Sequence, residues 1–372
     1  MENTKIGNKE AVALLVTITF NQLIINGSKA ILNNTSSASL LNILFLSIIT
    51  IIFTCVICYF LNKFPAFDLI DISDFLGGRF LKWVIGLLYI TYFIIFSGNL
   101  LHLFSTCLQI IYFPVTLLFF IRLFFVIGAT LTCLFKNNTV YRSTFVLFPI
   151  LIITTVFLFI SDIQFFYVEN VYPMFGEGIF TTFVSGLSNL IIFQALAYIF
   201  FLPPMLKNPS EIKKITINSI VLSSFLILLT VATVLFTFNG LVEIDELLPL
   251  YSAVRYIDYG SFFQKMNSIF LLIWIMSFVS YLGITLKISS TIFKKLTFAK
   301  SDFVFVIMLA ILLFFASGWQ KTYAISTAFI QDVLKYIFFI LVFGISLLIL
   351  ASACIKKKIV RWKKWVNIQY GF

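Results

Sequence analysis

The feature that most constrains this chain is a succession of about ten long apolar stretches with only short connections between them. Each stretch has the roughly 20 residues that an α-helix needs to cross the hydrocarbon core of a bilayer. Charged residues make up 11% of the chain, against about 25% in a soluble domain. The sequence therefore predicts an all-α integral membrane protein with ten transmembrane helices. The predicted spans are 10–32, 38–61, 81–108, 114–134, 143–163, 177–204, 215–237, 262–286, 302–318 and 328–354.

The positive charges of the chain collect in alternate connections. With the N-terminus in the cytoplasm, the outward connections hold only Arg255, Lys265 and Lys321, although the net charge is +11. This is the positive-inside pattern, and it predicts that both termini are cytoplasmic. The basic tail 355–372, with "KKKIVRWKKW", suits anionic headgroups of the lipid bilayer. We expect no nucleic-acid partner.

Two of the predicted spans are interrupted by small and polar residues. The first contains "NQLIINGSKAIL", with Asn26, Gly27 and Ser28, and the sixth contains "TTFVSGLSNLIIFQ", with Ser185 and Gly186. An unwound segment at Asn26 to Ser28 would free backbone groups that hydrocarbon cannot satisfy. Free amides at a half-helix favour a carboxylate, which predicts a ligand site. The alternative, that Gly and Ser only allow close helix packing, stays open.

The two interruptions occupy matching positions in two sets of five spans. The sets are 1–172 and 173–354, and the tail 355–372 follows them. Because five is odd, the second set must run with the opposite topology. Such inverted repeats are common in secondary transporters, which bind their substrates at mid-membrane between discontinuous helices. We therefore expect a 5+5 inverted repeat with helices 1 and 6 broken.

Helical spacing selects further candidates for the ligand site. Trp274, Ser277, Tyr281 and Thr285 recur at steps of three and four and so share one face of the eighth span. A face that mixes aromatic and hydroxyl groups suits a mostly apolar pocket with a few aimed polar groups. Hydrogen bonding between helices is the alternative explanation. The candidates outside the interruptions are Phe96, Ser97, Gln194, Trp274, Tyr281 and Thr285.

Other reactive residues give little support for catalysis. His102 is the only histidine, and no carboxylate lies near it in the sequence to orient it as a base. Cys55 and Cys58 form a CxxC inside an apolar span, where packing is the favoured interpretation. We expect no enzyme activity, no cofactor and no metal site. Lys29 and Arg122 are charges within spans. Snorkelling to the membrane interface is favoured for Lys29. Pairing with a helix-end carbonyl or a partner subunit is favoured for Arg122, and binding of a ligand's carboxylate is the alternative.

Two connections are predicted to form short helices. In "FPAFDLIDISDFLGGRF", Phe67, Ile70 and Phe75 alternate with three aspartates. This predicts an amphipathic helix on the cytoplasmic surface, ended by the Gly77-Gly78 pair. The outward segment 239–260 has an acidic start and an apolar middle, which predicts a helix that caps the outer entrance. A plain exposed loop is the alternative there.

Three stretches carry a resemblance to a known family. They are "FPAF…LGGRFLKWVIGLL", "NVYPMFGEGIFTTFVSG" leading to "FFLPP", and "PLYSAVRYIDYGSFFQKMNSIFLLIWIMSF". Together they resemble the membrane-embedded B subunit of bacterial spore germinant receptors. These subunits form a spore germination permease branch of the amino acid–polyamine–organocation superfamily. The resemblance covers essentially the whole chain in order.

The resemblance implies a ten-helix fold similar to the leucine-transporter type, located in the spore inner membrane. It also implies a receptor for a small-molecule germinant, commonly an amino acid, that acts with a membrane-embedded A subunit and a lipoprotein C subunit. The chain departs from the family pattern at Gly27, which has no second glycine or following proline, and at Ala197, near which the family often has an acidic residue. The motifs align Phe96, Gln194, Tyr281 and Thr285 with germinant-pocket positions.

Three classes of function remain open. The favoured one is a germinant-sensing subunit that signals to partner subunits. The second is a stand-alone secondary active amino-acid transporter, and the third is a structural assembly subunit that binds nothing. The acidic residues all fall in connections or near helix ends, which weakens proton-coupled transport because such carriers usually keep an acid or histidine within the membrane. Sodium coupling through carbonyls and hydroxyls needs no carboxylate.

Overall fold

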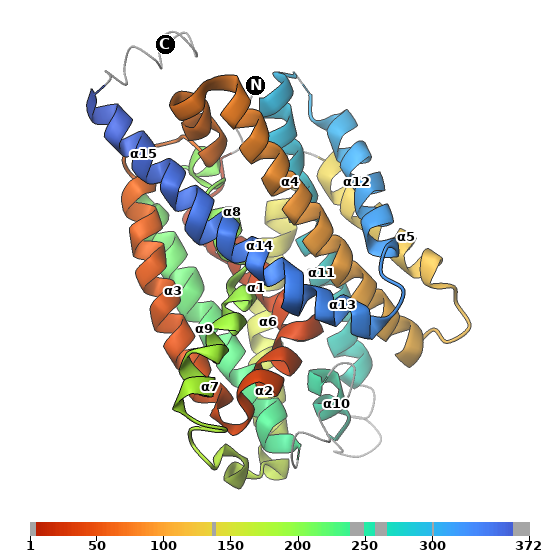
Figure 1. The fold of residues 1–372 in the computed structure, drawn as a ribbon. Coiled ribbons are helices and arrows are strands. Elements are labelled where there is room, and N and C mark those ends of the chain that lie inside the picture. Colours follow the sequence, from red (N-terminus) through yellow and green to blue (C-terminus); the bar gives the residue numbers. More distant parts are fainter. Residues whose placement is uncertain (1–4, 136–138, 239–248, 257–265, 300, 360–372) are drawn as a thin grey trace.

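In a computed structural model of the chain, residues 5–135, 139–238, 249–256, 266–299 and 301–359 are described, and they form a bundle of helices without a β-strand (Figure 1). Six helical stretches in this part of the chain are long and apolar enough to cross a membrane. The prediction of an all-α membrane protein is confirmed, and the count of ten spans stays a prediction. The six are Asn8–Leu61, Leu69–Ile111, Thr139–Phe165, Pro209–Thr237, Ile269–Thr297 and Tyr323–Lys358, and the shorter apolar helices are Leu118–Leu134, Ile179–Phe193 and Phe303–Gly318.

The first stretch contains two helices that run in opposite directions (Figure 1). The reversal occurs at Ser36, whose φ of 49° lies in the left-handed region. A stretch of this length therefore folds back on itself instead of projecting from the bundle. Its elements are α1 (Asn8–Gln22), a π-helical turn (Leu23–Gly27), α2 (Ser28–Thr35), a 3₁₀ turn (Ser36–Ala38) and α3 (Ser39–Leu61).

The next part of the chain contains the predicted amphipathic helix and three further helices. The amphipathic segment is the start of α4 and is broken from the rest at Gly78, whose φ of 67° suits a residue without a Cβ. Asp68 caps it by accepting a hydrogen bond from the Asp71 N–H (3.0 Å). The elements are α4 (Leu69–Ile111), α5 (Leu118–Leu134), α6 (Thr139–Asp162) and 3₁₀ turns at Ile163–Phe165 and Val168–Val171.

The remaining helices include two that are interrupted. One replaces the predicted sixth span, and the other replaces the tenth. The elements are α7 (Ile179–Phe183), a 3₁₀ helix (Ser185–Phe193), α8 (Ala195–Ile199), 3₁₀ turns (Pro203–Met205 and Pro209–Glu211), α9 (Ile212–Thr237), α10 (Pro249–Tyr256), α11 (Met266–Thr297), α12 (Phe303–Gly318), α13 (Tyr323–Phe329), a π-helical turn (Ile330–Leu334), α14 (Lys335–Phe339), a π-helical turn (Ile340–Ile345) and α15 (Ser346–Ile359).

The first helix lies inside the bundle. It packs against α6, α9 and α11, and every residue from Ala13 to Gln22 is buried. By contrast, α5 and α12 expose large apolar side chains such as Phe124 (62%) and Phe315 (69%). Water would make such exposure costly, so these faces suit lipid contact. The central position of α1 places its interruption in the middle of the molecule.

The beginning of α1 and the end of α15 lie at the same end of the bundle. The Ile6 N–H donates to the Met205 carbonyl (2.8 Å), and the Leu69 N–H donates to the carbonyl that ends α8 (3.1 Å). The Lys357 ammonium donates to the Lys63 carbonyl in the link before α4. This arrangement agrees with two termini on one side of a membrane; that this side is the cytoplasm stays a prediction.

The expectation that the aspartates of the amphipathic segment face water is wrong. Asp68, Asp71 and Asp74 are all buried. The Lys295 ammonium lies 2.6 Å from a carboxylate oxygen of both Asp68 and Asp71, and Lys82 pairs with Asp74 at 3.2 Å. The reason is that lysines on other turns and helices reach these carboxylates, so the segment can dock against the bundle with both faces covered.

Two predictions fall largely on residues outside the described ones. Of the outward segment 239–260, only α10 (Pro249–Tyr256) is described, so its role as a cap stays a prediction. The basic tail is described only as far as residue 359. The division into inverted repeats 1–172 and 173–354 likewise stays a prediction.

Candidate functional site

Four of the candidate side chains, two of them selected from helical spacing on the eighth span, meet in one buried polar network. The Ser97 and Tyr281 hydroxyls lie 2.8 Å apart, and Gln194 Nε2 donates to the Tyr281 hydroxyl (3.5 Å). Ser97 Oγ also donates to Thr285 Oγ1 (3.3 Å). Each of the four is at most 1% exposed. Side chains from α4, the sixth-span region and α11 thus converge at the centre of the bundle.

One member of the network was missed by sequence reasoning. The Tyr198 hydroxyl lies 3.0 Å from Thr285 Oγ1, and the Tyr198 ring stacks on Phe93 with centroids 4.2 Å apart. Tyr198 follows Gln194 by four residues, so helical spacing could have found it.

Two of the predicted aromatic residues are buried near this network without a polar contact to it. The Phe96 ring packs against Tyr92 with centroids 5.7 Å apart, and Trp274 is 2% exposed. The same face of α11 does reach α1, because Asn21 Nδ2 donates to Ser277 Oγ (2.9 Å). The predicted stripe therefore faces the interior of the bundle.

The interruption of the first helix lies where it was predicted but has a different form. Leu23–Gly27 is a π-helical turn, and the Ser28 N–H donates to the Leu23 carbonyl. The expectation of an unwound segment with free amides at Asn26 to Ser28 is therefore wrong for this conformation. A π turn holds one extra residue while keeping its backbone bonds, and such turns are frequent at functional sites.

The glycines of both interruptions allow close approach. A Cβ on Gly27 would lie 2.8 Å from Ile192 Cδ1, and a Cβ on Gly186 would collide with the Asn42 side chain. The φ of Gly27 is −68°, so space and not backbone conformation requires glycine there. Close packing, the alternative interpretation of these glycines, therefore applies at both positions.

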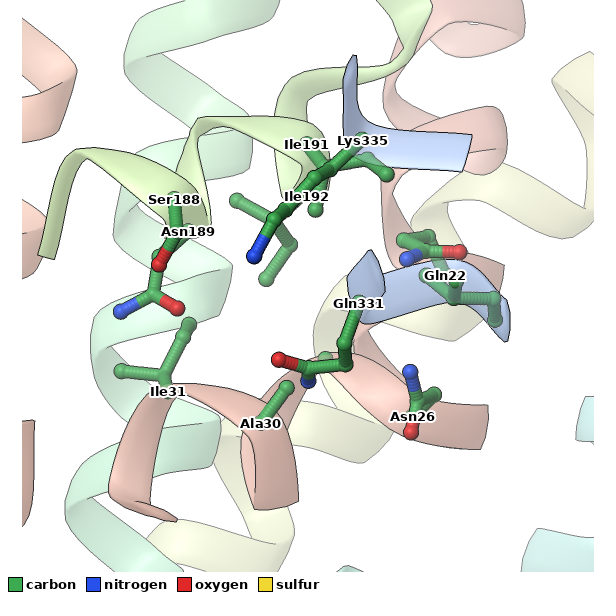
Figure 2. Close-up of a pocket in the computed structure, with 12 residues that line it drawn as sticks. Gln22, Asn26, Ala30, Ile31, Ser188, Asn189, Ile191, Ile192, Gln331 and Lys335 are labelled. Carbon is green, nitrogen blue, oxygen red and sulfur yellow. The ribbon is translucent and has the colours of Figure 1, made fainter. Parts of the chain in front are cut away.

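A third interruption, which was not predicted, meets the other two at a small cavity (Figure 2). It is the π-helical turn Ile330–Leu334. The cavity is narrow, with about 10 Å³ open to the centre of a water molecule, which is room for roughly one water. Its lining residues are Gln22, Asn26, Gly27, Ala30, Ile31, Ser188, Asn189, Ile191, Ile192, Ile330, Gln331 and Lys335.

A wider hollow of about 400 Å³ adjoins this cavity. Ser188 and Lys335 line both spaces, and Ser185 lines the hollow. Asn34 Nδ2 donates to Asn189 Oδ1 (2.7 Å) and so ties α2 to the 3₁₀ helix beside the cavity. The hollow has the position of an approach route. Its lining residues are Asn34, Val184, Ser185, Leu187, Ser188, Lys335, Tyr336 and Phe339.

Buried polar atoms at the cavity lack hydrogen-bond partners within the part of the chain that the structure describes. They include Gln22 Oε1 and Asn26 Nδ2. The two residues are 1% and 4% exposed. Ser28 Oγ, beside the same turn, is also unpartnered. An unsatisfied buried group costs about 1–3 kcal/mol. Such atoms are explained most simply by a ligand or water that binds there.

The charged residue at this cavity was missed although the sequence contains a signal for it. Lys335 lies within the predicted span 328–354, and a charge within a span was the criterion that selected Lys29 and Arg122. The structure places the Arg122 guanidinium 2.5 Å from Nδ1 of His102. The partner of Arg122 is therefore a histidine of α4, where a helix-end carbonyl or a partner subunit was expected.

Comparison with known proteins gives a family and a fold. A family model described as spore germination protein matches residues 5–325. No curated protein sequence matches the chain.

Solved structures of membrane transporters have a similar fold. Mhp1, a nucleobase-cation-symport-1 family transporter in a closed conformation with bromovinylhydantoin bound, has a TM-score of 0.66 and 14% identity, covering 91% of this chain and 75% of that chain. MhsT in complex with L-phenylalanine has a TM-score of 0.61 and 15% identity, covering 98% and 89%. A manganese transporter of Eremococcus coleocola has a TM-score of 0.55 and 12% identity, covering 93% and 76%. Mhp1 and MhsT have the leucine-transporter fold, so that fold is confirmed for this chain.

Proposed function

The chain belongs to the spore germination protein family, and on that premise we propose that it is the membrane-embedded sensing subunit of a germinant receptor. It binds a small molecule, such as an amino acid, in the middle of the membrane. A membrane-embedded A subunit and a lipoprotein C subunit read the bound state in the spore inner membrane. Its role is binding and signalling, without catalysis.

The observation that carries this proposal is the meeting of three helix interruptions at one cavity. The π-helical turns Leu23–Gly27 and Ile330–Leu334 face the 3₁₀ helix Ser185–Phe193 there. Unpartnered amide atoms of Gln22 and Asn26 are buried beside them. In transporter folds, substrates bind where helices are discontinuous. In a chain that served only as a structural subunit, these unsatisfied groups would destabilise the fold and have no function.

The described conformation has too little room at the cavity for an amino acid, and this suggests how binding becomes a signal. The cavity has room for about one water, so a ligand must enter a more open conformation through the adjoining hollow. The bound ligand then stabilises whichever conformation its contacts fit best. The polar network around Tyr281 is linked to the cavity through Gln194, which directly follows the 3₁₀ helix that lines it. We place the ligand's side chain toward Phe96, Gln194 and Tyr281.

A binding screen tests the proposal. Amino acids and nucleosides are added to the purified chain in detergent, and thermal stabilisation is measured, because a ligand that binds the folded state raises the unfolding midpoint. We expect one class of compound to stabilise the chain, and Gln194→Ala and Tyr281→Ala to weaken that effect. Thr144→Ala is the matched control, since Thr144 is a buried hydroxyl that donates to Val140 of its own helix (2.7 Å). If Gln194→Ala and Tyr281→Ala both bind the ligand with unchanged affinity, the proposed pocket is wrong.

A stand-alone secondary active amino-acid transporter is the second candidate. It is supported by the transporter fold shared with Mhp1 and MhsT. Net flux of the ligand through the chain alone distinguishes it from a receptor subunit.

A further inference from the structure

Lys335 brings a positive charge to the cavity. It begins α14, directly after the π-helical turn Ile330–Leu334. Figure 2 shows its side chain reaching into the cavity, with the ammonium in the space between Asn189 and Gln331. The same residue lines the adjoining hollow. A ligand that enters by the hollow therefore passes Lys335 before it reaches the interrupted helices.

No carboxylate balances this charge among the residues that the structure describes at either space. The linings contain amides, hydroxyls, aliphatic groups and aromatic rings, with no Asp or Glu. Asp332, three residues earlier, is exposed and belongs to neither lining. The neighbour that is seen is an aromatic ring, since Lys335 Nζ lies 5.0 Å from the ring centroid of Tyr336. An ammonium in such surroundings attracts an anion and repels a cation.

Gln22 and Asn26 line the same cavity as Lys335, and their unpartnered amide atoms indicate which groups of a ligand would bind there. Asn26 Nδ2 is a free donor, and Gln22 Oε1 is a free acceptor. A carboxylate only accepts hydrogen bonds, and an ammonium only donates them. The donor and Lys335 together fit a carboxylate, and the acceptor fits an amine.

We propose that Lys335 and Asn26 bind the ligand's carboxylate and that Gln22 accepts from its amine, so that the site selects small molecules with a free acid group. This inference rests on the proposed function and names the ligand chemistry of the same site. It makes Lys335 the residue that distinguishes a free acid from its uncharged amide.

Paired ligands that differ only in the acid group test the inference. A panel of neutral L-amino acids is titrated into the purified chain, each beside its carboxamide, and dissociation constants are measured by calorimetry. We expect at least one amino acid to bind, and its carboxamide to bind roughly 10- to 100-fold more weakly, as for the loss of a charge-assisted hydrogen bond. Lys335→Gln should weaken the acid by a similar factor and change the carboxamide little. Lys335→Arg, which keeps the charge, should preserve the preference for the acid.

Lys321→Gln is the control, because it removes the same charge from an exposed lysine in the connection between α12 and α13. The unfolding midpoint of each unliganded variant shows that it is folded. Equal affinity for acid and carboxamide, or an unaltered affinity of Lys335→Gln for the acid, would overturn this inference and leave the proposed function standing. Binding of a nucleoside but of no amino acid would overturn this inference alone, and binding of no compound from either class would overturn both.

Discussion

At the scale of single residues, Tyr281 illustrates how a polar side chain is held inside an apolar helix. Its hydroxyl pairs with Ser97 and accepts from Gln194, and the residue is fully buried. Removing one partner from such a network leaves the others unsatisfied in a medium of low dielectric. The network therefore ties α4 and the sixth-span region to α11.

Tyr281→Phe removes this hydroxyl and keeps the ring. We expect the free energy of unfolding to fall by about 1–3 kcal/mol, because Ser97 and Gln194 lose a buried partner. The apparent unfolding midpoint in detergent measures the change. Tyr167→Phe is the control, since Tyr167 is 55% exposed and should change the midpoint little. Equal midpoints for both variants would show that the network does not stabilise the bundle.

The sequence predicted this network better than it predicted the cavity. Tyr281 and Thr285 stand out because polar residues at helical spacing are visible against an aliphatic helix, and Ser97 and Gln194 stand out as polar residues near the middle of a span and below its interruption. Which polar residues of different helices meet depends on how the helices pack, and spacing within one helix does not determine that. Lys335 carries a local signal that was overlooked.

At the scale of elements, the composition of the first and sixth spans predicted where the helices are interrupted. It did not predict the backbone geometry of the interruptions. Small and polar residues mark where the helix departs from α geometry. Whether the departure is a π turn, a 3₁₀ helix or an unwound segment depends on neighbouring helices. At Gly27, for example, the neighbour is Ile192 of the 3₁₀ helix, which the sequence of the first span does not show. The π turn at Ile330–Leu334 contains the polar residues Gln331 and Asp332 but no glycine or proline, and it lies near the start of the predicted span 328–354, where polar residues are also expected in an unbroken helix.

Gly27→Ala tests the packing between the first two interruptions. The new Cβ would lie 2.8 Å from Ile192, and overpacking of this kind costs about 1–3 kcal/mol. We expect a lower unfolding midpoint and weaker ligand binding, and partial rescue by the double variant with Ile192→Ala. Gly344→Ala is the matched control, because Gly344 also lies in a π-helical turn and a Cβ there meets no atom within 4 Å. Failure of Ile192→Ala to rescue any loss would contradict the account.

The start of α4 gives a prediction about pH. Burial and the neighbouring Asp71 carboxylate raise the pKa of Asp68 from 3.8 to about 7, and one Lys295 ammonium cannot balance both carboxylates. The folded chain therefore keeps a proton that the unfolded chain releases above about pH 4. Stability from this group is present at low pH and is lost as the pH rises from about 4 to about 7.

Unfolding midpoints between about pH 5 and pH 8 check this expectation. The wild-type midpoint should fall with rising pH more steeply than that of Asp68→Asn, since asparagine resembles the protonated acid and does not titrate. Parallel pH profiles for the two proteins would show that Asp68 is already ionised in the folded state.

At the scale of the whole molecule, the pattern of apolar spans was sufficient to predict an all-α membrane protein. The resemblance to the germinant-receptor family was sufficient to predict the leucine-transporter fold. Apolar length alone identifies membrane helices because lipid leaves few alternatives. It could not show that the aspartates before Gly78 are buried, because Lys295, Lys82 and Lys356 reach that segment from later turns and helices. Contacts between residues far apart in sequence decide such details.

The central claim is that a transporter fold here binds a nutrient in order to report it. The most direct test is to reconstitute the purified chain in liposomes and to measure equilibrium binding and gradient-driven uptake of the same ligand. The account predicts saturable binding that Lys335→Gln weakens, with no accumulation inside the liposomes. Concentrative uptake by the chain alone would contradict it and make the protein a transporter.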